Sequence, residues 1–347
     1  MLSYLTKKIF YGALVMAGVI VVVFFLFQGF GDPTRLVLGQ TADAATQQNI
    51  RKELNLDQPK WKQFVTYLND VSPLSIHTRE EIAQKKLNGI FIGGDTKFGI
   101  KAPYLRRSYQ SRRDVWDVLT EALPGTIVLA MTAMLIAIVL GVPLGILAAV
   151  KKDTWMDSSS IFVSVLGISA PSFFMGIVIA YCFGFVLSAY TGLSMTGSLF
   201  ETDPFEGRQV VPANLVLPAI TLGIRPMAII AQLTRSSMLD VLNRDYIRTA
   251  YAKGLSKNAV IWKHALRNAL NPVITAITGW FAELLAGAFF VEYIFGWKGI
   301  GKVTVDALEN LDFPVVMGSV LVSSFFFIVI NILADIVYGI VDPRIRV

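Results

Sequence analysis

Few residues of this sequence have the types and spacing that catalysis or metal binding requires. The only two histidines, His77 and His264, are far apart in the chain, which argues against a histidine-based metal site. The single cysteine, Cys182, lies in an apolar run and can form no disulfide within the chain. The apolar runs hold no metal-type His/Glu spacing, no Gly-x-Ser-x-Gly elbow and no Asp-Asp pair, and the chain has no Gly-x-x-x-x-Gly-Lys-Ser/Thr phosphate loop. The sequence therefore indicates no enzyme active site.

Two charged residues within apolar runs are the strongest candidates for a binding role. Arg225 and Glu283 lie near the middle of two successive runs, at similar distances from the connection between them. An unpaired charge at that depth costs at least about 2.5 kcal/mol on insertion scales, so each side chain needs a partner. We predict that the two pair with each other beside a path through the membrane. The alternative is that each faces water or another subunit alone.

Membrane-spanning helices must position these charges. Of the 347 residues 54% are hydrophobic and only 16% are charged, and the apolar residues collect in runs of roughly 20, the length that crosses a bilayer. The first run is long for a signal peptide and lacks a small-x-small cleavage site, so we expect it to be retained. We predict an all-α membrane protein with six transmembrane helices at 9–30, 126–150, 160–187, 215–238, 270–292 and 315–341.

Lysine and arginine in the short loops predict the orientation of these helices. Basic residues lie at 7–8, 151–152, 244–267 and 344–346, and six spans place all of them on one side. That side is expected to be cytoplasmic, so both termini are expected inside. The chain then divides into a first transmembrane helix (1–30), a large external segment (31–125) and a membrane core (126–347).

The external segment has local patterns of its own. We expect a helix that begins at Asp43 or Thr46 and ends before Pro59, then a second helix at 61–71, and a strand or loop tip at 89–99. Within the membrane core, Pro143 and Pro171 are expected to mark kinks. Asp335 lies near the inside end of the last span, where it can reach the interface and serve structure.

The cytoplasmic segment at 239–268 is too regular to be a linker. Leu242, Tyr246 and Ala250 recur every four residues and predict one helical stripe. Gly254 then breaks the helix, and Ser256 can cap a second one. The result is a helix-turn-helix with a corner of small residues, which another protein could approach closely. The alternative is a basic amphipathic loop that rests on anionic lipid.

Several motifs in a consistent order resemble one family. Tyr246-Ile247-Arg248-Thr249-Ala250-Tyr251-Ala252-Lys253-Gly254-Leu255-Ser256 is similar to the coupling signature of permeases in ATP-binding-cassette (ABC) importers, and in particular of the peptide and nickel branch. The general signature begins with Glu-Ala-Ala, whereas Arg248, Thr249 and Ala250 stand here, which makes sugar and amino-acid importers less fitting. Gly31-Asp32-Pro33, Leu123-Pro124-Gly125-Thr126, Asp312-Phe313-Pro314 and Asp342-Pro343-Arg344 match the same branch. The external stretch at 75–103 looks like an insertion relative to the family.

The resemblance implies the B-type permease of a peptide importer in the inner membrane, with the type I ABC importer fold and a large periplasmic insertion between helices 1 and 2. It implies four kinds of partner: a homologous second permease in a heterodimer, two ATPase subunits, an external substrate-binding protein and membrane lipids, with no nucleic acid. No cofactor is expected on this chain, because ATP and Mg belong to the ATPase subunits. The residues expected to couple to the ATPases are Tyr246, Arg248, Thr249, Ala250, Ala252, Lys253, Gly254 and Leu255.

Other functions remain as alternatives. The same machinery could import nickel or a peptide-like antibiotic, and a secondary transporter is the alternative of another class, although the sequence shows no internal repeat. The external loops offer no channel-type filter. If the path carries peptides, Arg225 and Glu283 could also grip a peptide terminus. Dependence on a partner ATPase separates the importer from the other classes.

Overall fold

The computed structural model describes residues 2–28, 57–203, 205, 207–286 and 288–341. The helix expected after Asp43 or Thr46 lies outside these residues. The chain forms two compact units. One unit comprises Met1–Phe10, Leu123–Lys302 and Phe325–Val347, and the other comprises Tyr11–Ala122 and Val303–Ser324.

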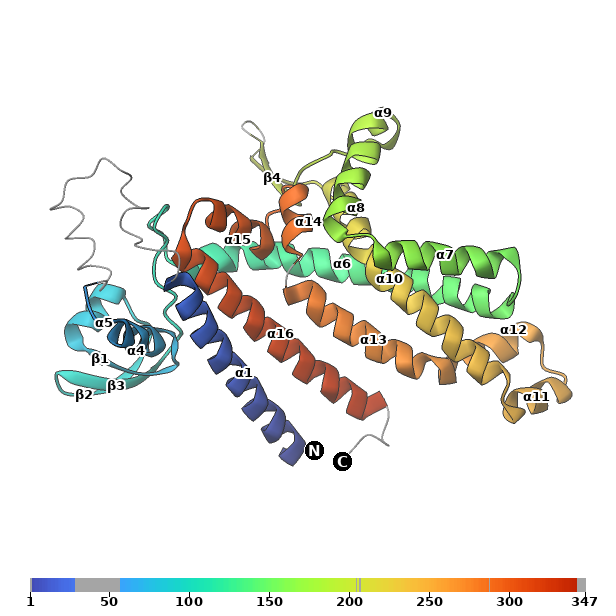
Figure 1. Ribbon diagram of the computed structural model, residues 1–347, viewed down its shortest axis with the longest axis horizontal. Helices are drawn as coiled ribbons and strands as arrows, with labels where there is room; N and C mark the ends of the chain where they lie inside the picture. The colour runs from blue at the N-terminus through green and yellow to red at the C-terminus, as the bar shows by residue number, and fades with distance from the viewer. Residues whose placement is uncertain (1, 29–56, 204, 206, 287, 342–347) are drawn as a thin grey trace. The chain divides into compact units, whose positions relative to one another are not determined.

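Long helices dominate the described chain (Figure 1). They are α1 (Leu2–Gln28), α6 (Val115–Val150), α7 (Trp155–Ser169), α10 (Ala213–Leu242), α13 (Leu266–Ala286) and α16 (Phe313–Val341). Among the described residues, α1, α6, α10 and α16 are long and apolar enough to cross a membrane, and a bent helix pair that begins with α7 is a fifth candidate. Five short strands accompany the helices, so the protein is mostly helical rather than all-α as predicted.

The third predicted span is broken in the middle. α7 ends at Ser169, and α8 (Ser172–Ile179) begins after Pro171 and continues as the π-helix η1 (Ala180–Val186). The two parts are bent by 107° relative to each other. Proline cannot donate a backbone hydrogen bond and disfavours helical geometry in the residue before it, here Ala170 with ψ 129°. The kink expected at Pro171 is confirmed, whereas α6 continues through Pro143.

The fifth predicted span also ends earlier than expected. α13 stops at Ala286, and a separate short helix, α14 (Phe289–Ile294), holds the residues that were assigned to its outer end. A loop then leads to α15 (Ile300–Glu309), which precedes α16. After η1, the chain forms the short helix α9 (Ser188–Thr191) and then a hairpin of β4 (Phe200–Asp203) and β5 (Gly207–Val210). This hairpin leads to α10.

Glycines bring α6 and α10 into close contact. A Cβ at Gly141 would lie 2.8 Å from the carbonyl oxygen of Met227, and a Cβ at Gly145 would overlap the carbonyl oxygen of Ala231. Both glycines are therefore required for the backbones to approach each other, as small residues four apart commonly are in membrane helix pairs. The contact places α6 against the C-terminal half of α10.

The second unit has its own apolar core. Ile20 and Phe24 of α1 pack there against Tyr67 and Val71 of α4 (Lys60–Val71). The rings of Phe24 and Tyr67 are stacked with centroids 5.5 Å apart. The helix predicted at 61–71 is thus confirmed as α4. Its buried face is set by Tyr67 and Val71, whereas Trp61 and Val65 are exposed.

A small antiparallel sheet follows α4. Its strands are β1 (Leu74–Thr78), β2 (Gly89–Gly93) and β3 (Thr96–Lys101), in the order β1-β3-β2, and α5 (Arg79–Lys85) connects the first two. α5 begins with a capping box, in which the Thr78 hydroxyl accepts from the Glu81 amide at 3.2 Å and the Glu81 carboxylate accepts from the Thr78 amide at 3.0 Å. The strand or tip expected at 89–99 is confirmed as the β2–β3 hairpin.

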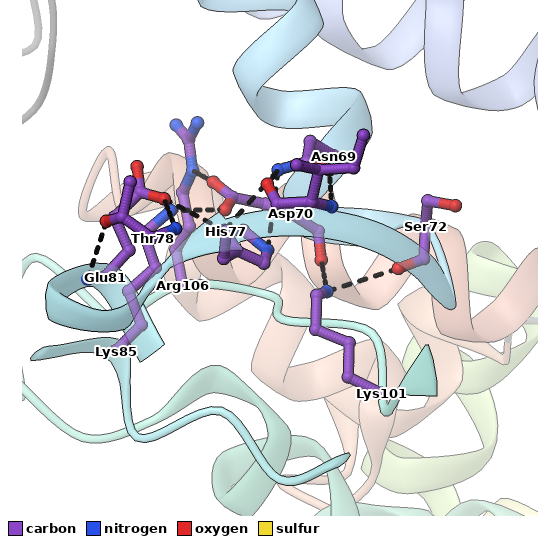
Figure 2. A network of polar contacts seen from close by, with 10 residues as sticks. Asn69, Asp70, Ser72, His77, Thr78, Glu81, Lys85, Lys101 and Arg106 are labelled. Carbon is purple, nitrogen blue, oxygen red and sulfur yellow. Dashed lines mark hydrogen bonds and ion pairs between the residues drawn. The ribbon is translucent and has the colours of Figure 1, made fainter. Parts of the chain in front are cut away.

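Figure 2 shows a buried polar cluster between α4 and this sheet. Asp70, 2% exposed, pairs with Lys85 at 2.5 Å and with Arg106 at 3.5 Å. Lys101 donates to the backbone oxygens of Asp70 and Ser72. Burial lowers the pKa of Lys101 to about 8, and the negative charge of Asp70 opposes this shift in part. The cluster ties Lys85 and Arg106 to the Asp70 carboxylate and Lys101 to the Asp70 backbone oxygen.

His77 lies in the same cluster and makes the stability of this region depend on pH. Burial lowers its pKa, and the positive charge of Lys85 lowers it further, while Glu81 at 3.4 Å opposes the shift. A histidine with a lowered pKa binds its proton less readily in the folded state than in the unfolded state. Its contribution to stability is therefore present above the unfolded pKa of about 6.5 and is lost as the pH falls through the folded value.

We expect hydrogen–deuterium exchange of residues 57–114 in the full complex to show weaker protection at pH 5 than at pH 7.5, after correction for intrinsic rates. His77→Gln should remove most of this pH dependence, whereas His264→Gln, a change in a different part of the chain, should keep it. An unchanged pH dependence in His77→Gln would assign the effect to other groups. Glu81, whose pKa is lowered mainly by the Thr78 amide, titrates at more acidic pH.

Candidate functional site

The segment with the coupling signature folds into two short helices joined by a tight corner (Figure 1). α11 (Asp245–Ala252) ends just before Gly254, which has φ +78°, and α12 (Lys257–Ala259) continues through the π-helix η2 (Val260–Ala265) into α13. The Ser256 hydroxyl accepts from the amide of Ala259 at 3.4 Å. The break at Gly254 and the cap at Ser256 are both confirmed. Positive φ is readily accessible to glycine, which is why this residue type ends the first helix.

One side of the corner packs on the membrane helices. Ile247, Ala250 and Ala265 are buried against Ile146 of α6 and Met238 of α10. The stripe predicted from Leu242, Tyr246 and Ala250 is therefore only partly correct: Ile247 takes the buried position next to Ala250, and Tyr246 is 42% exposed. The packing fixes the corner to the ends of α6 and α10.

The other side of the corner is open. Every residue from Tyr251 to Asn258 is exposed, including Ala252, Lys253, Gly254 and Leu255 of the predicted set. Arg248 and Thr249 are exposed on α11 as well. Three large apolar or aromatic side chains project from this surface, namely Tyr251 at 44%, Leu255 at 38% and Trp262 at 56% exposure. Of the predicted coupling residues, only Ala250 is buried.

A bidentate ion pair stabilises the same end of the helix bundle. Arg235 of α10 donates to both carboxylate oxygens of Asp157 in the first turn of α7, at 2.5 and 2.7 Å. Asp157 also accepts from the backbone amide of Asp153 at 3.1 Å. Nothing in the local sequence pattern indicates this pair, because its members are 78 residues apart. It holds the start of α7 against α10, about two turns before α10 ends at Leu242.

A cavity of about 220 Å³ lies between α8, α10, α13 and α14. Arg225 and Glu283 both line it, together with Trp280. The guanidinium of Arg225 lies over the Trp280 ring, 5.3 Å from its centroid, which is a cation–π geometry. Both charged side chains are exposed, and among the described residues that line the cavity they are the only ionisable ones.

The ion pair predicted between Arg225 and Glu283 is not formed. No ion pair joins the two within the described part of the chain, and Arg225 contacts the aromatic ring instead. The sequence correctly placed both residues at one site. It could not indicate that Trp280, one turn before Glu283 on α13, lies against the arginine. The cavity therefore presents a positive and a negative group separately.

At the start of α15, a second polar site that includes Thr126 of α6 has a structural role. The carboxylate of Glu292 is fully buried and accepts hydrogen bonds from the Thr126 hydroxyl at 2.7 Å and from the amides of Gly301 and Lys302 at 2.7 and 3.2 Å. The two amides belong to the first turn of α15, so the carboxylate caps that helix. The indole of Trp297, also fully buried, donates to the Gly125 oxygen at 2.9 Å.

The Glu292 site was not predicted from the sequence, in which Glu292 only marked the end of a predicted span. A signal is present: three glycines follow within nine residues, at 296, 299 and 301. A Cβ at Gly299 or Gly301 would overlap the Glu292 carboxylate, and a Cβ at Gly125 would overlap the Lys298 carbonyl oxygen. These glycines leave room for a buried acid at a helix start.

Near the C-terminal end of α16, Asp335 pairs with Lys8 of α1 at 2.8 Å. This agrees with the structural role expected for Asp335. Within the described residues, no group of three or more His, Cys, Asp or Glu side chains could hold a metal ion.

Comparison with known proteins identifies the family. Residues 141–347 match the family model described as "Binding-protein-dependent transport system inner membrane component", and residues 1–82 match the model of the corresponding N-terminal region. The glutathione transport system permease protein GsiC of Escherichia coli K12 is 35% identical over 348 residues, covering 100% of this chain and 99% of GsiC. The dipeptide transport system permease protein DppB of the same strain is 34% identical, covering 91% of this chain and 90% of DppB.

A solved structure supports the fold. The inward-facing MetNI methionine ABC transporter contains a chain that superimposes with a TM-score of 0.51 at 18% identity, covering 65% of this chain and 96% of that chain. The family matches and the two relatives span the membrane helices, the cavity and the corner at Gly254. The chain therefore belongs to the binding-protein-dependent transport system inner membrane components and is a multi-pass permease subunit of an ABC importer.

Proposed function

We propose that this permease imports peptides, in a complex with a homologous second permease, two ATPase subunits and an external substrate-binding protein. The observation that supports the assignment most directly is the full-length similarity to a glutathione permease and a dipeptide permease. Both named substrates contain peptide bonds and free charged ends. ATP and Mg are bound by the ATPase subunits, and this chain supplies the path and the mechanical connection.

The corner at residues 245–265 is the proposed contact with an ATPase subunit. It has an inner face fixed to α6 and α10 and an outer face with exposed Tyr251, Leu255 and Trp262. Exposed aromatic and apolar side chains on a rigid support are the groups that a protein partner covers. A basic loop resting on lipid remains the alternative for this surface. It would not require glycine at position 254.

Reconstitution tests this function. The complete complex in proteoliposomes should take up a free tripeptide only with ATP, the binding protein and both ATPases present. Uptake driven by an ion gradient without ATP would instead identify a secondary transporter. Uptake of nickel instead of peptide would still agree with an ABC importer, but it would identify nickel as the substrate.

A labelling experiment tests the proposed six-span topology, with both termini inside and the segment before α6 outside. The spans are α1, α6, the bent pair of α7 and α8, α10, α13 and α16. After Cys182→Ser, a single cysteine at Ile90 should react with a membrane-impermeant maleimide added from outside. A single cysteine at Lys257 should react only from the inside. Both parent side chains are exposed, so lack of reaction cannot be ascribed to burial. Reaction of both from one face would contradict six spans.

A further inference from the structure

We propose that the cavity lined by Arg225, Trp280 and Glu283 is a transient binding site for a zwitterionic peptide, in which Arg225 receives the free carboxylate and Glu283 the free ammonium group. The inference rests on the proposed peptide import and adds to it the residues that recognise the two ends of the substrate. The remainder of the wall is apolar or weakly polar, with Met175, Leu222 and Leu284 among its members.

The opposite charges stand apart in this cavity, which points to a ligand with two charges. Trp280 and Glu283 are three residues apart on α13 and so lie on one face of the helix, where Cβ atoms at this spacing are about 5–6 Å apart. The Arg225 guanidinium lies over the Trp280 ring, 5.3 Å from its centroid, and the aromatic ring supports its position. Arg225 thus contacts the aromatic ring, and within the described residues no ion pair joins it to Glu283.

The combination of charges selects the class of ligand. An anion alone would be repelled by Glu283, and a metal cation alone would be repelled by Arg225. A short peptide carries an ammonium group at one end and a carboxylate at the other, and two extended residues span up to about 7 Å. The planar guanidinium can take the carboxylate through two parallel hydrogen bonds. The aromatic ring and the apolar wall then contact the middle of the peptide.

The location suits a transient site. The cavity is lined by Ala170 and Ser172 at the sharp break between α7 and α8, and by Ala288 to Val291 at the break between α13 and α14. Helix breaks within a membrane domain occur where the backbone is buried in protein or lines a cavity. A change in either bend would alter the cavity and the separation of its charges.

The first test measures uptake of trialanine by the complete complex in proteoliposomes. Glu283→Gln removes the negative charge with little change in shape, and Arg225→Gln removes the guanidinium and its charge with a shorter polar side chain. We expect each to reduce uptake at least tenfold, while ATP hydrolysis stimulated by the binding protein stays within twofold of the wild type. Glu121→Gln and Arg79→Gln, matched changes at exposed positions outside the cavity, should leave both activities unchanged. Loss of ATPase stimulation or of assembly along with uptake would show that the charges contact the second permease and would overturn the proposal.

The second test locates the peptide. Alanyl-photoleucyl-alanine, irradiated during ATP-driven turnover, should label residues 221–226 or 280–291 of the wild-type chain. The same peptide with an acetylated amino end and an amidated carboxyl end should label them at least fivefold less. Labelling confined to other segments, or equal labelling by the blocked peptide, overturns the site. If the wild-type complex takes up no free peptide, the proposed function fails first, and the site fails with it.

Discussion

Gly254→Leu is expected to reduce ATP-driven uptake at least tenfold while the permease still inserts and assembles its membrane helices. Gly254 has φ +78° and forms the turn between α11 and α12. No heavy atom of the described chain lies within 4 Å of the position that a Cβ would take there, so the side chain itself meets no internal obstacle. The conformational cost of the left-handed backbone is roughly 1–2 kcal/mol. The larger effect should arise outside the chain, where the added side chain projects from the surface proposed to contact the ATPase.

The matched control is Gly192→Leu. Gly192 ends α9 with φ +66° and also has no heavy atom within 4 Å of an added Cβ, so the backbone strain is similar. It lies between the bent pair and α10, on the opposite side of the membrane in the proposed topology. Uptake and ATPase stimulation are measured at equal expression for both variants. Equal loss in the two would mean that strain alone explains the effect, and wild-type uptake by Gly254→Leu would remove this corner from the coupling surface.

Glu292→Ala should destabilise the permease by at least about 3 kcal/mol. The substitution leaves the Thr126 hydroxyl and the amides of Gly301 and Lys302 without their buried acceptor, and each unsatisfied group costs about 1–3 kcal/mol. It also opens a void beside Trp297, which lies in the same region with no exposed surface. The measurement is the thermal unfolding midpoint of the detergent-solubilised complex, together with the yield of assembled permease.

Two further variants test whether the loss of the buried hydrogen bonds causes the destabilisation. Glu292→Gln keeps the volume and one acceptor oxygen, so its loss of stability should fall between the wild type and the alanine variant. Glu121→Ala removes a carboxylate of the same type from an exposed ion pair with Arg113, and the unfolding midpoint should change little. A midpoint for Glu292→Ala close to that of Glu121→Ala would mean that water or neighbouring groups replace the carboxylate.

The parts of the fold that follow from short-range rules could be predicted from the sequence. The break at Gly254 and the cap at Ser256 depend on residues within a few positions of each other, and both are present. The apolar runs correctly predicted α6, α10 and α16, since length and composition suffice for that. The kink at Pro171 followed from the chemistry of proline, but its angle of 107° depends on how α8 packs against α14 and α10.

The features that the sequence could not indicate join residues far apart in the chain. Glu292 and Thr126 are 166 residues apart, and Arg235 and Asp157 are 78 apart. No periodicity connects such positions, and a single sequence gives no covariation between them. Arg225 and Glu283 show the same limit at shorter range. Their positions in the apolar runs predicted a similar depth for both, but the contact of Arg225 with Trp280 depends on helix packing that the sequence does not show.

The close contact of α6 and α10 has a mechanical consequence. An added Cβ at Gly141 or Gly145 would meet α10 after Pro226, at Met227, Ile230, Ala231 and the following turn, and Ala133 of α6 approaches Gly223 before it. Pro226 removes one backbone hydrogen bond of α10 and so provides a point of bending beside Arg225. The 16 residues from Met227 to Leu242 form a helical arm of about 24 Å. If the corner at Gly254 shifts by about 4 Å, the arm turns by about 10° around the proline. A push delivered at the corner would thereby be converted into a small rotation of α10 beside Arg225.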